Sequence, residues 1–258
     1  MILTSDYHTH TPYSHGKNTV LENAMAAKAK GLKEIGITDH GFNHLVFGLK
    51  RRKLVDLRAE INEAEKLTGV RVLMGMESNL TSVKGDTDML KTDLKYFDLY
   101  LCGIHEVLRF KSICDFYKIF IKNYGAYKLG KRPSDKSVAV TTQAYINAIK
   151  KNPIDIITHI NYKCFCDVVE VAKCCADYGT YIEINTKKRH VSAEELNRMA
   201  ATGVRFVIDS DAHSAGRVGD TAIAEEILAE ASVPLEQIDN IDGRLPNFRF
   251  ARYKAENL

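Results

Sequence analysis

Seven short apolar segments with the composition of β-strands recur along the chain, and a helix or a long crossover follows each of them. We expect these strands at residues 2–8, 34–40, 70–76, 98–104, 154–158, 180–184 and 204–208. Such alternation is typical of parallel strands, and seven or eight strand–helix units predict a (β/α) barrel in a single domain over residues 1–258. A doubly wound open sheet is the alternative, but no G-x-G-x-x-G motif or P-loop follows any of these strands.

Helix signals separate the strands. We expect helices at about residues 19–30, 142–151 and 221–230, two that end near Gly69 and Gly179, and one that runs from the capping box Ser192-x-x-Glu195 to Gly203. Residues 114–124 form a helix-like run, and the tail beyond residue 230 is expected to add little.

The composition is that of an ordinary globular protein. Apolar residues make up 45% and charged residues 27% of the 258 positions, and the formal charge of +3 does not call for a nucleic acid or a membrane as partner. The sequence contains neither an apolar run of ~20 residues nor a charged-then-apolar leader, so we expect a cytoplasmic protein. The six cysteines form no C-x-x-C pair, and a functional role for Cys164-x-Cys166 is the less favoured interpretation.

Side chains that bind metals follow one predicted strand after another. His8 and His10 are two residues apart, so both imidazoles leave the same face of an extended segment, and Asp211 and His213 repeat this spacing. The other side chains of this kind at or just beyond strand ends are His15, His40, Glu77, His105, His159 and Asn185. Because the carboxyl ends of barrel strands meet at one mouth, we expect this set, which includes seven of the nine histidines, to converge there. Histidine and carboxylate without thiolate suit zinc, manganese or iron, and one zinc ion takes only about four to five ligands, so we predict two or three metals.

Five motifs resemble, in order, those of the polymerase-and-histidinol-phosphatase (PHP) family. They are His8-Thr-His10, Thr38-Asp39-His40-Gly41, Gly75-Met-Glu77, Gly103-Ile-His105-Glu106 and Ser210-Asp211-Ala-His213. The resemblance covers about residues 1–250 and is closest to the bacterial phosphatase branch, to which Glu183-Ile-Asn185 and His15 also point. It implies a distorted (β/α)7 TIM-like barrel with a trinuclear metal site.

The resemblance also implies how the ligands divide among three metals. The first would be held by His8, His10, Glu77 and Asp211, the second by His15, His40 and His213, and the third by Glu77, His105 and His159, with Glu77 as a bridge. Zinc is the expected metal, with manganese or iron as alternatives. Clustered divalent ions acidify a bound water to hydroxide and clamp phosphate oxygens. We therefore expect a phosphoesterase that hydrolyses a small phosphomonoester.

Two residues near the ligands are candidates for catalysis. Asp39 could orient His40 or a water, although a simple turn cap is the alternative. Arg217, four residues after His213, could bind phosphate through its forked guanidinium or could simply lie on the surface.

Lys187, Lys188 and Arg189 follow the sixth strand and are candidates, with Arg217, for substrate binding. A solvated charged face is the alternative interpretation of this run. His44 and His190 are left without a role.

Residues 107–136 hold eight Lys or Arg against two Asp and are longer than this branch of the family usually needs, so we expect a basic insertion. With Ile160-Asn-Tyr, which stands where the family often has a Pro-Gly-type turn, it borders the mouth where the substrate is chosen. Its aromatic residues could stack bases, which leaves a nuclease or nucleotide phosphatase as an alternative, but at helical spacing a buried face is more usual.

Histidinol phosphate is another substrate to consider, and a non-catalytic metal-binding scaffold is the least favoured interpretation. Nucleic acid is thus a less favoured partner than a small phosphorylated molecule, and the oligomeric state is not predicted.

Overall fold

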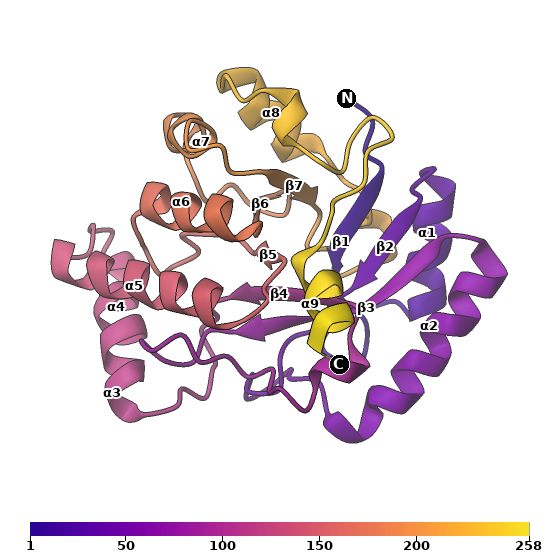
Figure 1. Ribbon diagram of the computed structural model, residues 1–258, viewed down its shortest axis with the longest axis horizontal. Coiled ribbons are helices and arrows are strands. Elements are labelled where there is room, and N and C mark those ends of the chain that lie inside the picture. Colours follow the sequence, from indigo (N-terminus) through magenta and orange to yellow (C-terminus); the bar gives the residue numbers. More distant parts are fainter. Residues whose placement is uncertain (258) are drawn as a thin grey trace.

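Seven parallel strands form a single sheet whose spatial order equals their order in the sequence (Figure 1). They are β1 (Ser5–Thr9), β2 (Glu34–Ile37), β3 (Arg71–Asn79), β4 (Leu99–Gly103), β5 (Ile156–Ile157), β6 (Tyr181–Asn185) and β7 (Phe206–Asp209). The computed structural model describes residues 1–257. Every neighbouring pair is parallel, so the strand arrangement predicted from the alternation is confirmed. β3 extends further than expected, and Glu77 therefore lies within it rather than after it.

The first and last strands close the sheet into a barrel through an irregular contact. His10 N donates to Ala212 O (2.8 Å) and Ala212 N donates to His8 O (3.1 Å). Deeper in the barrel a side chain replaces the backbone ladder, because Asp209 Oδ1 accepts a hydrogen bond from Tyr7 N (2.7 Å). The chain thus forms the distorted (β/α)7 barrel that the family resemblance implied.

Helices surround the strands in Figure 1. They are α1 (Val20–Ala29), α2 (Leu54–Thr68), α5 (Asp135–Lys151), α6 (Val168–Tyr178), α7 (Ala193–Ala200) and α8 (Ala222–Glu230). The capping box at Ser192 opens α7, and left-handed glycines end α2 at Gly69 and α6 at Gly179, as the sequence predicts. α5 begins well before the expected residue 142, because Ser134 caps it by accepting a hydrogen bond from Ser137 N. Within residues 1–257, no helix combines the length and the hydrophobicity needed to cross a bilayer.

Short 3-10 turns join several of these elements. They occur at Arg51–Lys53, Leu94–Tyr96, Ala215–Arg217 and Leu235–Gln237.

The basic segment at residues 107–136 forms a helical excursion between β4 and α5. It contains α3 (Ile113–Asp115), a π-helical stretch (Phe116–Ile121) and α4 (Lys122–Lys128). Phe116, Phe120, Tyr124 and Tyr127 stack on one another in that order, with ring centroids 5.9, 4.7 and 6.1 Å apart. Phe120 is buried, and Phe116 and Tyr124 pack against the core. The helical spacing of these rings therefore marks a packed face, as expected.

The interior of the barrel is filled by side chains from the strands and by one from the C-terminal tail. They are Tyr7, Leu73, Leu99, Leu101, Ile156, Tyr181, Val207 and Phe248. Phe248 makes edge contacts with Tyr7 (centroids 4.8 Å apart) and Tyr181 (5.8 Å). Phe248 leads into α9 (Arg249–Asn257), which lies over the middle of the barrel in Figure 1. Asp155, directly before β5, accepts a hydrogen bond from Phe250 N (2.8 Å). The expectation that the tail adds little is wrong, because it closes the end of the barrel opposite the strand carboxyl ends.

Candidate metal centre

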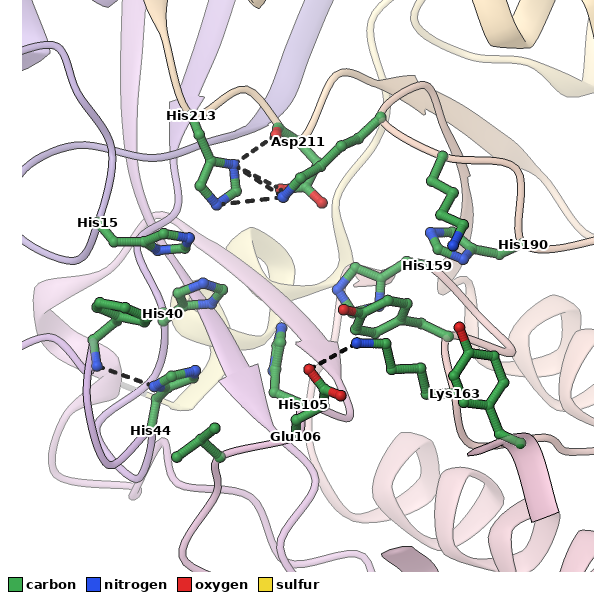
Figure 2. Close-up of a pocket in the computed structure, with 16 residues that line it drawn as sticks. His15, His40, His44, His105, Glu106, His159, Lys163, His190, Asp211 and His213 are labelled. Atoms are coloured by element: carbon green, nitrogen blue, oxygen red, sulfur yellow. Dashed lines mark hydrogen bonds and ion pairs between the residues drawn. The ribbon is translucent and has the colours of Figure 1, made fainter. Parts of the chain in front are cut away.

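The side chains predicted to bind metals converge at the carboxyl ends of the strands. Six of them line one cavity of about 520 Å³ (Figure 2), namely His15, His40, His105, His159, Asp211 and His213. The other three, His8, His10 and Glu77, are fully buried against these six. All nine predicted ligands are therefore brought together.

Glu77 lies at the centre of the cluster. Its Oε1 is 2.6 Å from His159 Nε2, 3.0 Å from His105 Nε2 and 3.2 Å from His8 Nε2. Its Oε2 is 2.7 Å from His40 Nδ1. One buried carboxylate thus presents each oxygen to different imidazoles, which is the arrangement that a carboxylate shared by two metal ions requires.

Asp211 is the second acidic residue of the cluster. Its Oδ1 is 3.3 Å from both His10 Nε2 and His213 Nδ1, and 3.9 Å from His8 Nε2. His15 completes this side, since its ring centroid is 4.1 Å from that of His213. Asp211 also holds a φ of 47°, a left-handed conformation that costs about 1–3 kcal/mol in a residue other than glycine and is typical of functional sites.

Buried polar atoms of the cluster lack the partners that a protein interior normally supplies. No residue within 1–257 hydrogen-bonds His8 Nε2, His10 Nδ1 or Nε2, His15 Nδ1, His40 Nδ1, His159 Nδ1 or Glu77 Oε2. His40 Nδ1 and Glu77 Oε2 lie close to each other but not in hydrogen-bond geometry. Because each unpaired buried atom costs about 1–3 kcal/mol, so many in one place need another partner. Divalent cations are the partners that imidazole nitrogens and carboxylate oxygens share, so the residues fit a metal cluster.

Three overlapping groups have ligand atoms within 4.8 Å of one another, and each could hold an ion. They are His8–His10–Asp211, His10–His40–His213 and His40–Glu77–His105. The first agrees with the first metal implied by the family resemblance. His15 and His159 lie outside these groups, yet His159 reaches Glu77 and the His15 ring is 4.8 Å from that of His40. The site can hold several metals, and the division of ligands among three ions stays a prediction.

Glu183 of β6 fixes the orientation of two ligands. Its Oε1 accepts a hydrogen bond from His8 Nδ1 and its Oε2 accepts one from His159 N, both at 2.6 Å. Because a carboxylate can only accept, His8 Nδ1 carries the proton and His8 Nε2 is left free to bind a metal. Glu183 was expected only as part of a motif of the family resemblance, without a role of its own.

Asn79 plays the same part for His105. Asn79 Nδ2 donates to Asp88 (2.6 Å), which turns its Oδ1 toward His105 Nδ1 (2.7 Å). His105 Nε2 then faces Glu77. No role was assigned to Asn79 from the sequence, although its place two residues after Glu77 on β3 puts both side chains on the same face of the strand.

Burial and charge set the protonation of the cluster. Burial raises the pKa of Glu77 and of Asp211, but the surrounding imidazoles outweigh it and hold both pKa values well below the ordinary range. Burial lowers the pKa of His40 to about 3 and that of His10 well below its ordinary value. Ionised carboxylates and neutral imidazoles are the forms that bind metals. His8 and His159 are the exceptions, because the carboxylates around them outweigh burial and raise both pKa values, so a metal at either residue must displace a proton.

Asp39 does not reach the cavity. Its buried carboxylate accepts hydrogen bonds from Thr11 N (2.8 Å), Thr11 Oγ1 (2.6 Å) and Ser14 Oγ (2.5 Å). Burial raises the pKa of Asp39 to about 6. The expected contact with His40 or a reacting water is thus replaced by contacts to the loop after β1, and the turn-cap alternative describes its position.

Lys187 and Lys188 line the cavity, as expected for substrate-binding residues. Lys187 Nζ lies 3.2 Å from Asp211 Oδ1 and 3.1 Å from His213 Nδ1. The Lys187 ammonium lies between a carboxylate and an imidazole, at a position where positive charge is favoured. This supports the interpretation of the cluster as a metal centre.

Arg189 and Arg217 lie outside the cavity, contrary to expectation. The Arg189 guanidinium binds both carboxylate oxygens of Glu230 (2.9 and 2.6 Å). Arg217 lies in a 3-10 turn, and its Nη2 donates to Thr186 O (2.8 Å) while its Nη1 pairs with Asp220 (2.9 Å). Both guanidiniums are occupied by these partners, so neither is placed to contact phosphate at the metal centre.

Several residues without an expected role also line the cavity. They are His44, Phe47, Glu106, Val107, Tyr127, Tyr162, Lys163 and His190. Figure 2 shows His44 beside His40, and their rings stack 4.9 Å apart. Their position in the sequence could have indicated that His44 and His190 lie at the site. His44 shares a loop with His40, and His190 follows the strand that ends at Asn185. All nine histidines of the chain therefore gather at this site.

The chain is similar to known proteins along most of its length. The family model described as PHP domain matches residues 6–187. A probable phosphatase of Shewanella baltica (strain OS195) is 32% identical over 253 residues, which cover 91% of this chain and 85% of the relative. A probable phosphatase of Thermoanaerobacter sp. (strain X514) is 30% identical over 257 residues, which cover 94% and 92%.

Solved structures share the fold. A histidinol phosphate phosphatase from Lactococcus lactis, determined with zinc, L-histidinol and phosphate, has a TM-score of 0.62 at 16% identity and covers 90% of this chain and 94% of its own. A histidinol phosphatase from Listeria monocytogenes has a TM-score of 0.61 at 14% identity and covers 84% and 97%. With the five motifs, the converging ligands and relatives that span nearly its whole length, this chain belongs to the PHP domain family.

Proposed function

We propose that this protein is a metal-dependent phosphomonoesterase that releases inorganic phosphate from a small substrate. The observation that carries the proposal is the set of buried, unpaired imidazole and carboxylate atoms around Glu77, next to an open cavity. The relatives' name, probable phosphatase, supports the same activity. Zinc is favoured by the nitrogen-rich ligand set and by its presence in the Lactococcus structure, and manganese or iron are alternatives.

The metals would be held by the nine predicted ligands. These are His8, His10, His15, His40, Glu77, His105, His159, Asp211 and His213. Bound divalent ions supply an acidified water and stabilise negative charge on phosphate oxygens. Glu183 and Asn79 hold the imidazoles in their binding directions, and Lys187 and Lys188 add positive charge for a phosphate dianion. In the reaction, a water oxygen bonds to phosphorus, the ester P–O bond breaks and the leaving oxygen takes up a proton.

A small molecule suits the cavity better than a nucleic acid does. Its volume of about 520 Å³ suits a sugar, nucleotide or amino-alcohol phosphate. Most aromatic rings of the basic segment are packed on one another and on the core rather than offered to bases.

All six cysteines within residues 1–257 are free thiols, which fits the reducing cytoplasm.

A phosphate-release screen tests this function. The protein is stripped with a chelator, reconstituted with Zn²⁺ or Mn²⁺ and assayed on sugar phosphates, nucleotides, histidinol phosphate, dinucleotides and short single-stranded DNA. We expect release from at least one monoester, loss of activity on chelation and recovery on adding metal. Glu77→Gln should abolish release, whereas the matched change Glu63→Gln on the exposed face of α2 should not. Activity that survives exhaustive chelation, or no release from any ester, would contradict the proposal.

A further inference from the structure

A second cavity, of about 530 Å³, lies next to the one over the metal centre. It is lined by Tyr127, Gly130, Lys131, Arg132, Val138, Asn161, Phe165, Cys166, Glu195 and Arg198. Tyr127 lines both cavities, so the two are neighbours with this residue between them. A ligand that extends beyond the metal centre on this side would enter the second cavity.

Three cations in the second cavity have no acidic partner. Lys131, Arg132 and Arg198 are exposed and form no ion pair with any residue of 1–257. Glu195 is the single carboxylate in the lining, and it already accepts a hydrogen bond from Ser192 N (2.8 Å) at the start of α7. The three positive charges are therefore available to an anion from outside.

This positive charge is local rather than general. Residues 107–136, which supply Tyr127, Lys131 and Arg132, hold eight Lys or Arg against two Asp. Because the whole chain has a formal charge of only +3, the remaining residues together are net negative. The field that attracts anions is thus concentrated on the side of the metal centre where the second cavity lies.

The wall between the two cavities is aromatic and close to neutral. Tyr127 and Phe165 lie with ring centroids 6.5 Å apart, and on the metal side the charge of Lys163 is balanced by Glu106 (2.7 Å). The loop that forms this wall holds His159, Asn161 and Lys163 at φ values of 27°, 70° and 56°. Three non-glycine residues in the left-handed region store strain that is typical of a functional site. A ligand bridging the cavities would therefore need anionic groups at both ends and an uncharged part between them.

We propose that the second cavity binds a second phosphate, carried by the leaving group of the substrate, while the phosphomonoester that is hydrolysed lies over the metal centre. This inference rests on the proposed function. One water is consumed, the ester P–O bond to the terminal phosphate breaks, and the phosphorylated alcohol leaves with the proton. Small bisphosphates and 5′-phosphorylated oligonucleotides share this chemistry.

The test compares matched substrates with and without the second phosphate. The metal-loaded enzyme is assayed on fructose 1,6-bisphosphate against fructose 1-phosphate, and on 5′-phosphorylated diadenylate against AMP. For each pair, the ratio of kcat/KM with the second phosphate to kcat/KM without it measures the contribution of the second cavity. The triple variant Lys131→Gln, Arg132→Gln, Arg198→Gln should lower this ratio about ten- to a hundredfold for at least one pair. The control Lys28→Gln, Lys66→Gln, Lys150→Gln, with the same charge change at exposed helix positions, should leave it within twofold.

The pair that responds identifies the source of the second phosphate. A response for the fructose pair indicates a small bisphosphate, and a response for the adenylate pair alone indicates an oligonucleotide. A wild-type ratio below one for both pairs, or a ratio within twofold of wild type in the triple variant, would overturn the proposal.

A binding measurement separates this proposal from the proposed function. Equilibrium dialysis uses the metal-loaded protein and analogues of both two-phosphate substrates in which a methylene phosphonate replaces the scissile ester. The Kd of at least one analogue should rise tenfold or more in the triple variant. If wild type releases no phosphate from any ester but this Kd still depends on the three cations, the function fails and the second anion site stands. A Kd within twofold of wild type for both analogues would overturn the site itself.

Discussion

Replacing Glu183 with Gln removes the charge that orients two metal ligands while it keeps the shape of the side chain. In the native protein its two oxygens accept hydrogen bonds from His8 Nδ1 and His159 N, both at 2.6 Å, in a fully buried position. Glutamine offers one oxygen and one NH2 group, so one of these donors would face another donor. Either the His8 ring turns or the His159 peptide shifts, and the Nε2 atoms of both residues move relative to Glu77.

The expected loss is in metal affinity rather than in folding. Removing the partner that orients a metal-bound histidine ordinarily costs about 10–100-fold in affinity, or about 1.4–2.8 kcal/mol. Because Glu183 orients two ligands and also supplies negative charge beside the cations, we expect the upper half of that range, about 30–100-fold. The apo protein should keep its fold, since the substitution creates no cavity.

A competition titration measures this loss. Zinc is added to the stripped protein in the presence of a fluorescent chelator, and far-ultraviolet circular dichroism confirms that the variant is folded. Glu63→Gln on α2 is the control, since it makes the same chemical change at an exposed position. A zinc Kd within threefold of wild type for Glu183→Gln would refute the reasoning.

Three further predictions follow from the described contacts. Glu77→Ala should remove more metal than His15→Ala, because Glu77 contacts several imidazoles at once; equal losses in elemental analysis would argue against a bridging carboxylate. Arg217→Ala should leave kcat/KM within about twofold while Lys187→Ala lowers it about ten- to a hundredfold, and the reverse order would return the phosphate contact to Arg217. Burial raises the pKa of Asp155 from 3.8 to about 7, so the native state keeps a proton that the unfolded chain has lost, and the free energy of unfolding should fall as the pH rises from about 4 to about 7. Urea unfolding of the stripped protein should show this slope reduced in Asp155→Asn; equal slopes would contradict the assignment.

The barrel and its metal ligands could be predicted because their signals are local. Apolar runs separated by helix signals identify the parallel strands, and polar residues just after such runs must meet at one end of the barrel. The pairs His8/His10 and Asp211/His213 needed only the two-residue period of an extended chain to be placed on one side. The structure brings these side chains together with Glu77.

Positions that depend on distant neighbours could not be predicted in this way. Glu183 meets His8 across 175 residues of sequence, and no local pattern marks that contact. Arg217 has the right residue type and spacing for a phosphate contact, but a 3-10 turn and Asp220 direct it elsewhere. Phe248 of the tail fills the interior of the barrel and contacts Tyr7 near the other end of the chain, and no local pattern in the tail marks that contact.

Metal content is the most direct test of the central claim that the nine converging side chains form a multinuclear metal site. The protein is stripped, reconstituted with excess zinc, freed of unbound metal by gel filtration and analysed by inductively coupled plasma mass spectrometry. We predict two to three zinc ions per chain, because the ligand atoms form three overlapping groups around Glu77 and Asp211. A value below one zinc per chain would contradict the claim.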